Sequence, residues 1–180
     1  MHAPLKPVTW YVDRFDVLRH AMAIARPEGL VLEFGVASGV TIGFLAANMP
    51  DQKIFGFDSF KGLPEAWSDY SAGHFACEIP QVPDNVELVI GTFEQTLTSF
   101  VAQHQGAVAL LHLDCDLYSS TKTVLDRLGP QIIPGTVIVL DEFWIVTDHE
   151  QRAFNEWLAA TGRSGRYEAR SIEQLCVVME

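Results

Sequence analysis

The chain has 180 residues, which is enough for one well-buried domain and too few for two, so we interpret residues 1–180 as a single domain. Its net charge of −11, from 12 basic and 23 acidic residues, argues against nucleic acid or an anionic membrane as a partner, because both attract clustered Lys and Arg. The sequence shows neither a charged and apolar leader nor an apolar run of membrane-spanning length, so we expect a soluble, cytoplasmic protein.

The N-terminal segment, residues 1–28, is predicted to be helical over residues 7–26. Its apolar residues recur at helical spacing, and Pro27 and Gly29 end the pattern. We expect this helix to cover one edge of a sheet or of a cofactor cleft; a helix that only packs against the core is the alternative.

A strand, a glycine turn and a helix follow. Leu30 to Phe34 is an apolar run too short for a helix and suits a strand buried on both faces, whereas Val40 to Asn48 has the length of a packed helix. Gly35 and Gly39 mark the turn between them, where glycine allows unusual backbone angles and a close approach of a ligand to the main chain.

The next predicted strand, residues 53–57, ends at Asp58, about where an open α/β sheet presents a carboxylate to ribose hydroxyls. The turn lacks the third glycine of G-x-G-x-x-G, and the charge of Glu33 just before it would repel a pyrophosphate. A cationic nucleoside without phosphates therefore fits better than a dinucleotide. A nicotinamide-dependent oxidoreductase and a turn without any ligand are the alternatives.

Residues 59–85 form a long connection that is rich in Gly, Pro, Ser and Asp but also carries several aromatic side chains. Connections of this length are usually functional or disordered, and the aromatic residues favour function. We interpret the segment as a lid that closes over a bound acceptor; packing of the aromatic side chains onto the domain is the alternative.

Further strands alternate with helices in the rest of the chain. Residues 86–90 are a predicted strand, which places Gly91 and Thr92 at the same sheet edge as Asp58. The other predicted elements are a helix to about residue 105, a strand at 107–113, a helix at 117–128 with Asp116 or Ser119 as its cap, a strand within 130–140, a helix from about 149 to 160 with Asp148 as its cap, and strands at 167–171 and 175–179.

The last two strands are separated by only a few residues, which permits an antiparallel pair and excludes a parallel crossover. We therefore expect a Rossmann-like, doubly wound α/β fold with a mostly parallel, seven-stranded sheet and a C-terminal antiparallel pair.

Three acidic residues follow two of these strands: Asp114 after one, and Asp141 and Glu142 after the next. If the strands are neighbours, the three carboxylates meet and a hard cation would relieve their repulsion. Oxygen ligands favour Mg²⁺, and the three cysteines, which lie far apart and are expected to be reduced thiols, offer no zinc site. Solvated strand ends, with Asp116 as a helix cap, are the alternative.

Three longer segments carry a resemblance to a known family. They read FGFDSFKGLPE, VELVIGTFEQTL and LDCDLYSSTKTVLDRLGPQIIPGTVIVLDEF, and they occur in this order between residues 30 and 143. They resemble the successive signatures of the macrocin-type (TylF/MycF) metal-dependent sugar O-methyltransferases, which are class I S-adenosylmethionine-dependent methyltransferases. The resemblance implies an enzyme that transfers a methyl group to a hydroxyl of a small molecule, either a sugar or a phenolic or vicinal diol.

The same resemblance implies roles for individual residues. Mg²⁺ would be held by Asp114, Asp141 and Glu142, although the family usually has Asp where this chain has Glu142. The residues implied to line the S-adenosylmethionine site are Glu33, Gly35, Ser38, Gly39, Asp58, Ser59, Gly91, Thr92 and Asp114.

Methyl transfer needs a group that accepts the hydroxyl proton, and Asp116 and His149 are the candidates near this edge. An exposed residue in the first turn of a helix is the alternative for His149, and we interpret His112, inside an apolar strand, as a core histidine. Family members have a longer N-terminal leader, so we expect a second copy of the chain, in a homodimer, to complete the acceptor pocket. The alternative function is a methyltransferase-like protein that binds the nucleoside without turnover.

Overall fold

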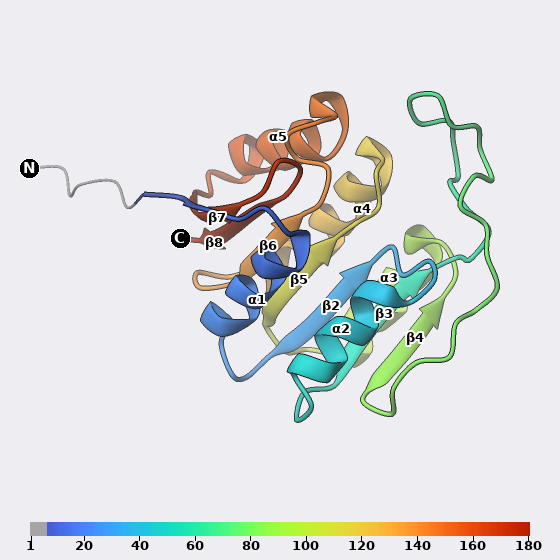
Figure 1. Ribbon diagram of the computed structural model, residues 1–180, viewed down its shortest axis with the longest axis horizontal. Helices are drawn as coiled ribbons and strands as arrows, with labels where there is room; N and C mark the ends of the chain where they lie inside the picture. The colour runs from blue at the N-terminus through green and yellow to red at the C-terminus, as the bar shows by residue number, and fades with distance from the viewer. Residues whose placement is uncertain (1–6) are drawn as a thin grey trace, which may run out of the picture.

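The computed structural model describes residues 7–180 as one eight-stranded sheet between two layers of helices (Figure 1). The elements in chain order are β1 (Thr9–Trp10), α1 (Arg14–Ile24), β2 (Leu30–Phe34), α2 (Val40–Asn48), β3 (Ile54–Asp58), β4 (Val86–Ile90), α3 (Phe93–Gln103), β5 (Val108–Leu113), α4 (Tyr118–Leu128), a 3₁₀ turn (Gly129–Gln131), β6 (Val137–Leu140), a π-helix (Thr147–Gln151), α5 (Arg152–Thr161), β7 (Gly165–Arg170) and β8 (Leu175–Met179).

The strand order is β1-β7-β8-β6-β5-β2-β3-β4. The central strands β6, β5, β2 and β3 are parallel neighbours, and all six residues of β5 are buried, as its unbroken apolar sequence requires. β8 runs antiparallel to β6 and β7, which confirms the predicted C-terminal pair. The eighth strand is the two-residue β1, which pairs with β7 and is too short to be visible as a sequence pattern.

Two hydrophobic clusters hold the helices to the sheet. One joins α1 and α2 to one face through residues such as Leu18 and Leu45, and the other joins α3, α4 and α5 to the opposite face through residues such as Leu97, Leu125 and Phe154. Figure 1 shows α1 and α2 crossing in front of the strands. This three-layer arrangement confirms the doubly wound α/β fold.

Several boundaries differ from the sequence predictions. The N-terminal helix was predicted from residue 7 but begins at Arg14, because the preceding residues pair with β7 and Asp13 accepts the N–H of Phe15 as the cap. The first six residues of the predicted N-terminal segment lie outside the described part of the chain. The predicted caps of α4 were wrong: Leu117 occupies the cap position and its side chain makes no capping bond.

The helix predicted from residue 149 begins instead as the π-helix Thr147–Gln151, and Asp148 lies inside it and does not cap it. All three cysteines are free, as predicted. Within residues 7–180, no helix has the length and apolar character needed to span a bilayer.

The direction in which successive strands are added to the sheet reverses between β4 and β5. The chain proceeds from β2 through β3 to β4 on one side, and then returns to place β5 and β6 on the other side of β2. In an open α/β sheet, such a switch point leaves a crevice at the carboxyl ends of the strands, where ligands bind. The fold therefore fixes the position of the site before any side chain is considered.

Candidate active site

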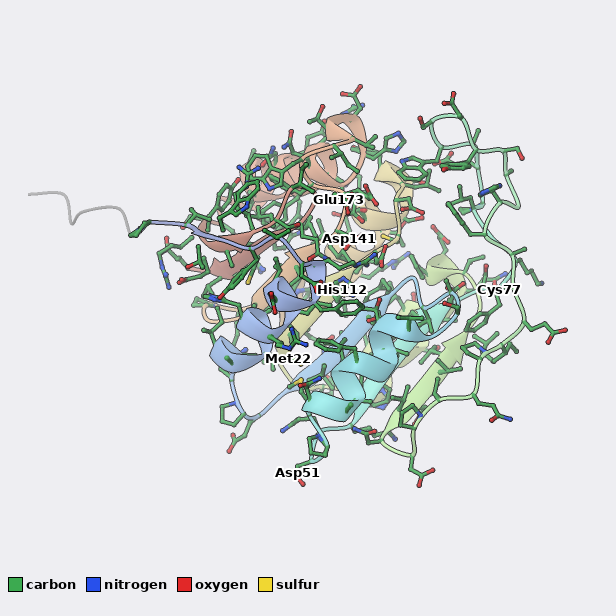
Figure 2. All side chains as sticks on the ribbon, in the orientation of Figure 1. Met22, Asp51, Cys77, His112, Asp141 and Glu173 are labelled. Atoms are coloured by element: carbon green, nitrogen blue, oxygen red, sulfur yellow. The ribbon has the colours of Figure 1, made fainter. Side chains whose placement is uncertain are left out.

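A cleft of about 710 Å³ lies at this carboxyl edge. Residues that follow β2, β3, β4, β5 and β6 line it, together with the first residues of α1 and part of the segment after β3. In Figure 2, Asp141 and Glu173 lie toward this edge, whereas Asp51 lies at the opposite end of the sheet.

The glycine turn after β2 forms one wall of the cleft. Gly35 has a φ of 92°, and a side chain there would overlap the carbonyl oxygen of Asp114 at the end of β5, so only glycine allows the two strand ends to pack this closely. Asp58 fixes the same turn, because its Oδ2 accepts the N–H groups of Val36 at 2.9 Å and Ala37 at 2.8 Å. Asp58 therefore shapes the turn as well as lining the cleft.

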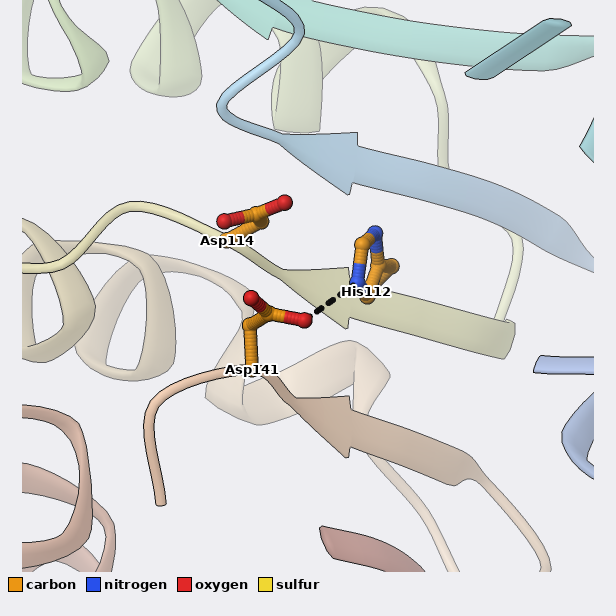
Figure 3. Close-up of side chains that lie close together, drawn as sticks. All are labelled: His112, Asp114 and Asp141. Atoms are coloured by element: carbon orange, nitrogen blue, oxygen red, sulfur yellow. Dashed lines mark ion pairs between the residues drawn. The ribbon is translucent and has the colours of Figure 1, made fainter. Parts of the chain in front are cut away.

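Of the three acidic residues predicted to meet after β5 and β6, Asp114 and Asp141 converge, whereas Glu142 lines the same cleft outside their cluster. Asp114 and Asp141 come together with His112, and one ligand atom from each of the three lies within 4.8 Å of the others (Figure 3). Between the two carboxylates lies a group that the sequence did not indicate: Nη2 of Arg14 donates to Asp114 Oδ2 at 2.9 Å and to Asp141 Oδ1 at 3.1 Å.

His112 is buried, as predicted for a core histidine, but it is also part of this cluster. Its Nδ1 lies 3.1 Å from Glu33 Oε2, and its Nε2 lies 3.9 Å from Asp141 Oδ1. Burial opposes its charge, but the carboxylates of Asp141 and Glu33 raise the pKa of His112 to about 10. The imidazolium therefore supports an ionised Asp141 from below the cleft.

Two further acidic residues, Asp116 and Glu142, line the cleft. Burial, reinforced by the charge of Asp141, raises the pKa of Asp116 to about 6. Burial and the nearby carboxylates, with Asp141 first among them, raise the pKa of Glu142 to about 7. The edge carries more carboxyl groups than cations, and this balance favours a positively charged ligand.

Glu150 of the π-helix is a residue that the sequence analysis missed. It is fully buried, and its two carboxyl oxygens accept the backbone N–H groups of Cys115 and Glu142, each at 3.2 Å. It thereby joins the turn after β5 to the turn after β6. No periodic pattern marks it, because it lies in a short polar run, and neither Glu150 nor Arg14 carries a signal in the sequence alone.

The structure brings most of the predicted site residues to the cleft, but not all. The predicted residues that line it are Gly35, Ser38, Asp58, Ser59, Gly91, Thr92, Asp114, Asp116, Asp141 and Glu142. Glu33 and Gly39 do not: Glu33 is buried beneath the cleft against His112, and Gly39 is the N-cap residue of α2. His149 is not brought to the cleft either, because its Nδ1 accepts the N–H of Tyr118 at the start of α4.

The known proteins that resemble this chain are methyltransferases by description. A family model described as a methyltransferase domain matches residues 32–143. The chain is 27% identical over 163 residues to 8-demethyl-8-(2,3-dimethoxy-alpha-L-rhamnosyl)-tetracenomycin-C 4'-O-methyltransferase of Streptomyces olivaceus, a match that covers 74% of this chain and 61% of that protein. It is 24% identical to mycinamicin III 3''-O-methyltransferase of Micromonospora griseorubida, over 89% of this chain and 77% of the relative.

Solved structures share the fold. The calicheamicin methyltransferase CalS11 superposes with a TM-score of 0.73 at 24% identity, covering 93% of this chain and 80% of CalS11. The O-methyltransferase NovP superposes with a TM-score of 0.71 at 19% identity, covering 91% and 78%. The chain spans about three fifths of the length of the tetracenomycin relative. Since the family model covers more than half of the sequence, the protein belongs to the methyltransferase domain family.

Proposed function

We propose that this protein is an S-adenosylmethionine-dependent O-methyltransferase that acts on a hydroxyl of a small molecule, with a sugar as the favoured acceptor. The observation that carries the proposal is the cleft at the switch point, where the Asp58-bound glycine turn faces a carboxylate-rich strand edge. The two relatives are O-methyltransferases by name, and one name includes a rhamnosyl group. The segments that resemble the macrocin-type family support placement in that subfamily.

The cleft suits the proposed methyl donor. Gly35 and Ser38 would lie under the methionine portion, and Asp58 and Ser59 would face the ribose. The sulfonium would approach Asp114 and its acidic neighbours, whose carboxyl groups outnumber the cations at this edge and would be favoured in their ionised form by a bound cation. The chain's own contribution to catalysis is to hold the sulfonium methyl in line with an acceptor oxygen, since near-attack geometry supplies much of the acceleration in such transfers.

We also propose Mg²⁺ as a helper ion. Asp114 and Asp141 present converging carboxylate oxygens, and Glu142 lines the same cleft with one carboxyl oxygen that is buried without a hydrogen-bond partner. This oxygen donor set fits a hard cation. When bound by these three residues, the ion would lower the pKa of an acceptor hydroxyl.

Asp116 is the base that the geometry favours over His149. Asp116 lines the cleft, whereas the Nδ1 of His149 is engaged by the N–H of Tyr118. With a pKa of about 6, raised by burial and Asp141, Asp116 is ionised at neutral pH and can accept a proton.

Residues 59–85 are proposed to act as a lid over the bound acceptor. The segment after β3 folds back on itself: Trp67 and Tyr70 exchange backbone hydrogen bonds, and their rings stack with centroids 5.6 Å apart. Trp67, Tyr70 and Phe75 line the cleft, so an acceptor entering it would meet an aromatic wall.

A second copy of the chain is proposed to complete the acceptor end of the cleft. Phe75 and Ile145 support this, because both line the cleft and yet are about half exposed. An active enzyme that is strictly monomeric would contradict the proposal.

The decisive test is calorimetric titration with S-adenosylmethionine and S-adenosylhomocysteine in chelator, followed by a panel of vicinal diols with and without Mg²⁺. We expect saturable nucleoside binding in both conditions and diol binding only with the ion. Absence of nucleoside binding in both would overturn the proposed function.

A matched variant tests the metal proposal on its own. Asp141→Ala should abolish the Mg²⁺ dependence of diol binding and lower methyl transfer, while nucleoside binding is retained. Unchanged transfer with an unchanged metal requirement would show that Asp141 does not hold the ion.

A further inference from the structure

Arg14 holds an unusual position at the site. It is the first residue of α1, and Asp13 and the pairing of the preceding residues with β7 fix the start of that helix at the cleft. A single nitrogen, Nη2, donates to both Asp114 and Asp141, at 2.9 and 3.1 Å. The guanidinium therefore occupies the space between the two carboxylates, where it neutralises part of their charge.

A divalent ion bound by the same pair would need this space. Mg²⁺ binds carboxylate oxygens at about 2.0–2.1 Å, so an ion that bridged Asp114 Oδ2 and Asp141 Oδ1 from the cleft side would collide with the nitrogen that already contacts both. The two cations would also repel each other. Arg14 and the ion therefore compete for these two oxygens.

Asp141 has further partners that would hold it in place if Arg14 moved away. The Arg14 side chain is 36% exposed, whereas that of Asp141 is 2% exposed. Asp141 keeps a hydrogen bond from Gln174 and the nearby imidazole of His112, whose buried Nε2 faces the pair without a hydrogen-bond partner (Figure 3). The carboxylate is thus fixed from the protein side and blocked only from the solvent side.

We propose that Arg14 is a tethered cation that competes with a divalent ion for Asp114 and Asp141, so that metal binding requires the guanidinium to swing out of the cleft. The inference rests on the proposed metal site. Arg14 then lowers the affinity of the site for the metal ion without being a metal ligand itself. It also couples arrival of the ion to a change at the start of α1, where Arg14 and Phe15 line the cleft.

The test compares Arg14→Gln with Arg19→Gln. Arg19 lies on the same helix, where it forms an ion pair with Asp16 and lies over the ring of Phe44. It does not line the cleft, so its loss removes the same formal charge without touching the site. Mn²⁺ is titrated into each protein without nucleoside, and free Mn²⁺ is followed by electron paramagnetic resonance. Because a hydrogen bond between charged groups is lost from the competing state, Arg14→Gln should tighten Mn²⁺ binding by about tenfold or more, and Arg19→Gln by less than about twofold.

Two further variants locate the effect. Asp141→Asn in the Arg14→Gln background should remove the gain, and Arg14→Lys, which keeps the charge on a single-point donor, should give an intermediate affinity. Circular dichroism of each variant confirms that it is folded.

Equal Mn²⁺ affinities in the wild type and Arg14→Gln would overturn the competition. If neither protein binds Mn²⁺ while S-adenosylhomocysteine binds in chelator, the competition is also overturned, and the methyltransferase proposal stands without a metal.

Discussion

At the scale of single residues, Glu150 shows how a side chain outside the cleft can organise it. Its carboxyl group accepts one backbone N–H from the turn after β5 and one from the turn after β6. These turns carry Asp114 and Asp116 on one side and Asp141 and Glu142 on the other. The relative placement of the acidic residues therefore depends on a residue that does not touch the proposed substrate.

Glu150→Ala should be strongly destabilising, because it leaves two buried N–H groups unpaired at a combined cost of roughly 2–6 kcal/mol in the free energy of unfolding. Glu150→Gln retains one acceptor oxygen and should lose about half as much. Urea unfolding measures both. If the alanine variant were as stable as the wild type, the proposed bridge between the turns would be wrong.

Gly35, at the start of the glycine turn, and Gly43, inside α2, form a matched pair for substitution. Gly35→Ala should cost at least about 1–2 kcal/mol for the positive φ alone, and more because the new methyl overlaps the carbonyl oxygen of Asp114. Gly43, inside α2, has open space around it, so Gly43→Ala should stabilise the protein by about 0.5–1 kcal/mol. Thermal unfolding of both variants tests this, and a neutral Gly35→Ala would contradict the close packing of the strand ends.

At the scale of elements, the segment between β3 and β4 has no regular strand or helix but is held by its own hydrogen bonds. Leu63 and His74 pair through their backbones, as do Trp67 and Tyr70. Leu63 and Trp67 also pack against Leu117 before α4. The segment, the green stretch of Figure 1, is thus attached to the body at its base and carries its aromatic side chains to the cleft.

Phe75→Ala tests the acceptor role of this segment. Phe75 lines the cleft, is 47% exposed and contacts rings of its own segment, so its removal should leave the core of the fold intact. Loss of one aromatic contact should raise the KM for the acceptor roughly two- to tenfold and leave the Kd for S-adenosylhomocysteine unchanged. Ile79→Ala, in the same segment, is the control, because Ile79 is 53% exposed and lies outside the cleft lining. Equal effects of the two changes would argue against an aromatic acceptor wall.

At the scale of the whole molecule, the concentration of charge at one sheet edge predicts a pH dependence of stability. The pKa of His112 is raised to about 10, so its stabilising charge is fully present below about pH 6.5 and is lost as the pH rises through 10. The pKa of Glu142 is raised to about 7, so the penalty for ionising it is absent at acid pH and complete above pH 7. Both groups make the folded state less stable as the pH rises.

We therefore expect the Tm in chelator to fall by several degrees between pH 5.5 and pH 9.5 as these two groups titrate. Burial also raises the pKa of Asp116 to about 6 and that of Asp114 to about 8, so both act in the same direction. Glu142→Gln should flatten the acid half of this profile, because the penalty that arises at Glu142 is removed. Scanning calorimetry across the pH range provides the measurement. A Tm that rises steadily over this interval would contradict the assigned shifts.

The sequence by itself determined the main strands and helices of the protein and their order in the chain. The strand Leu30–Phe34, the helix Val40–Asn48 and the strand Val86–Ile90 begin and end where their apolar patterns predicted, and the antiparallel end of the sheet followed from a short connection. Strand ends then placed Asp58, Asp114 and Asp141 at one edge. The spacing of apolar residues along the chain indicates which side chains are buried. The buried positions are sufficient to predict the strands and helices, and thereby the sheet edge at which the strands end.

Only the tertiary structure decided which charged groups meet there. Arg14 reaches Asp114 and Asp141 across 100 and 127 residues of sequence, Glu33 is turned under the cleft toward His112, and Glu150 joins two turns. No periodic pattern encodes such pairings, because each depends on how α1 and the π-helix pack against the ends of the sheet. The ion pairs and hydrogen bonds of the site therefore depend on long-range packing of strands and helices that short-range patterns already predict.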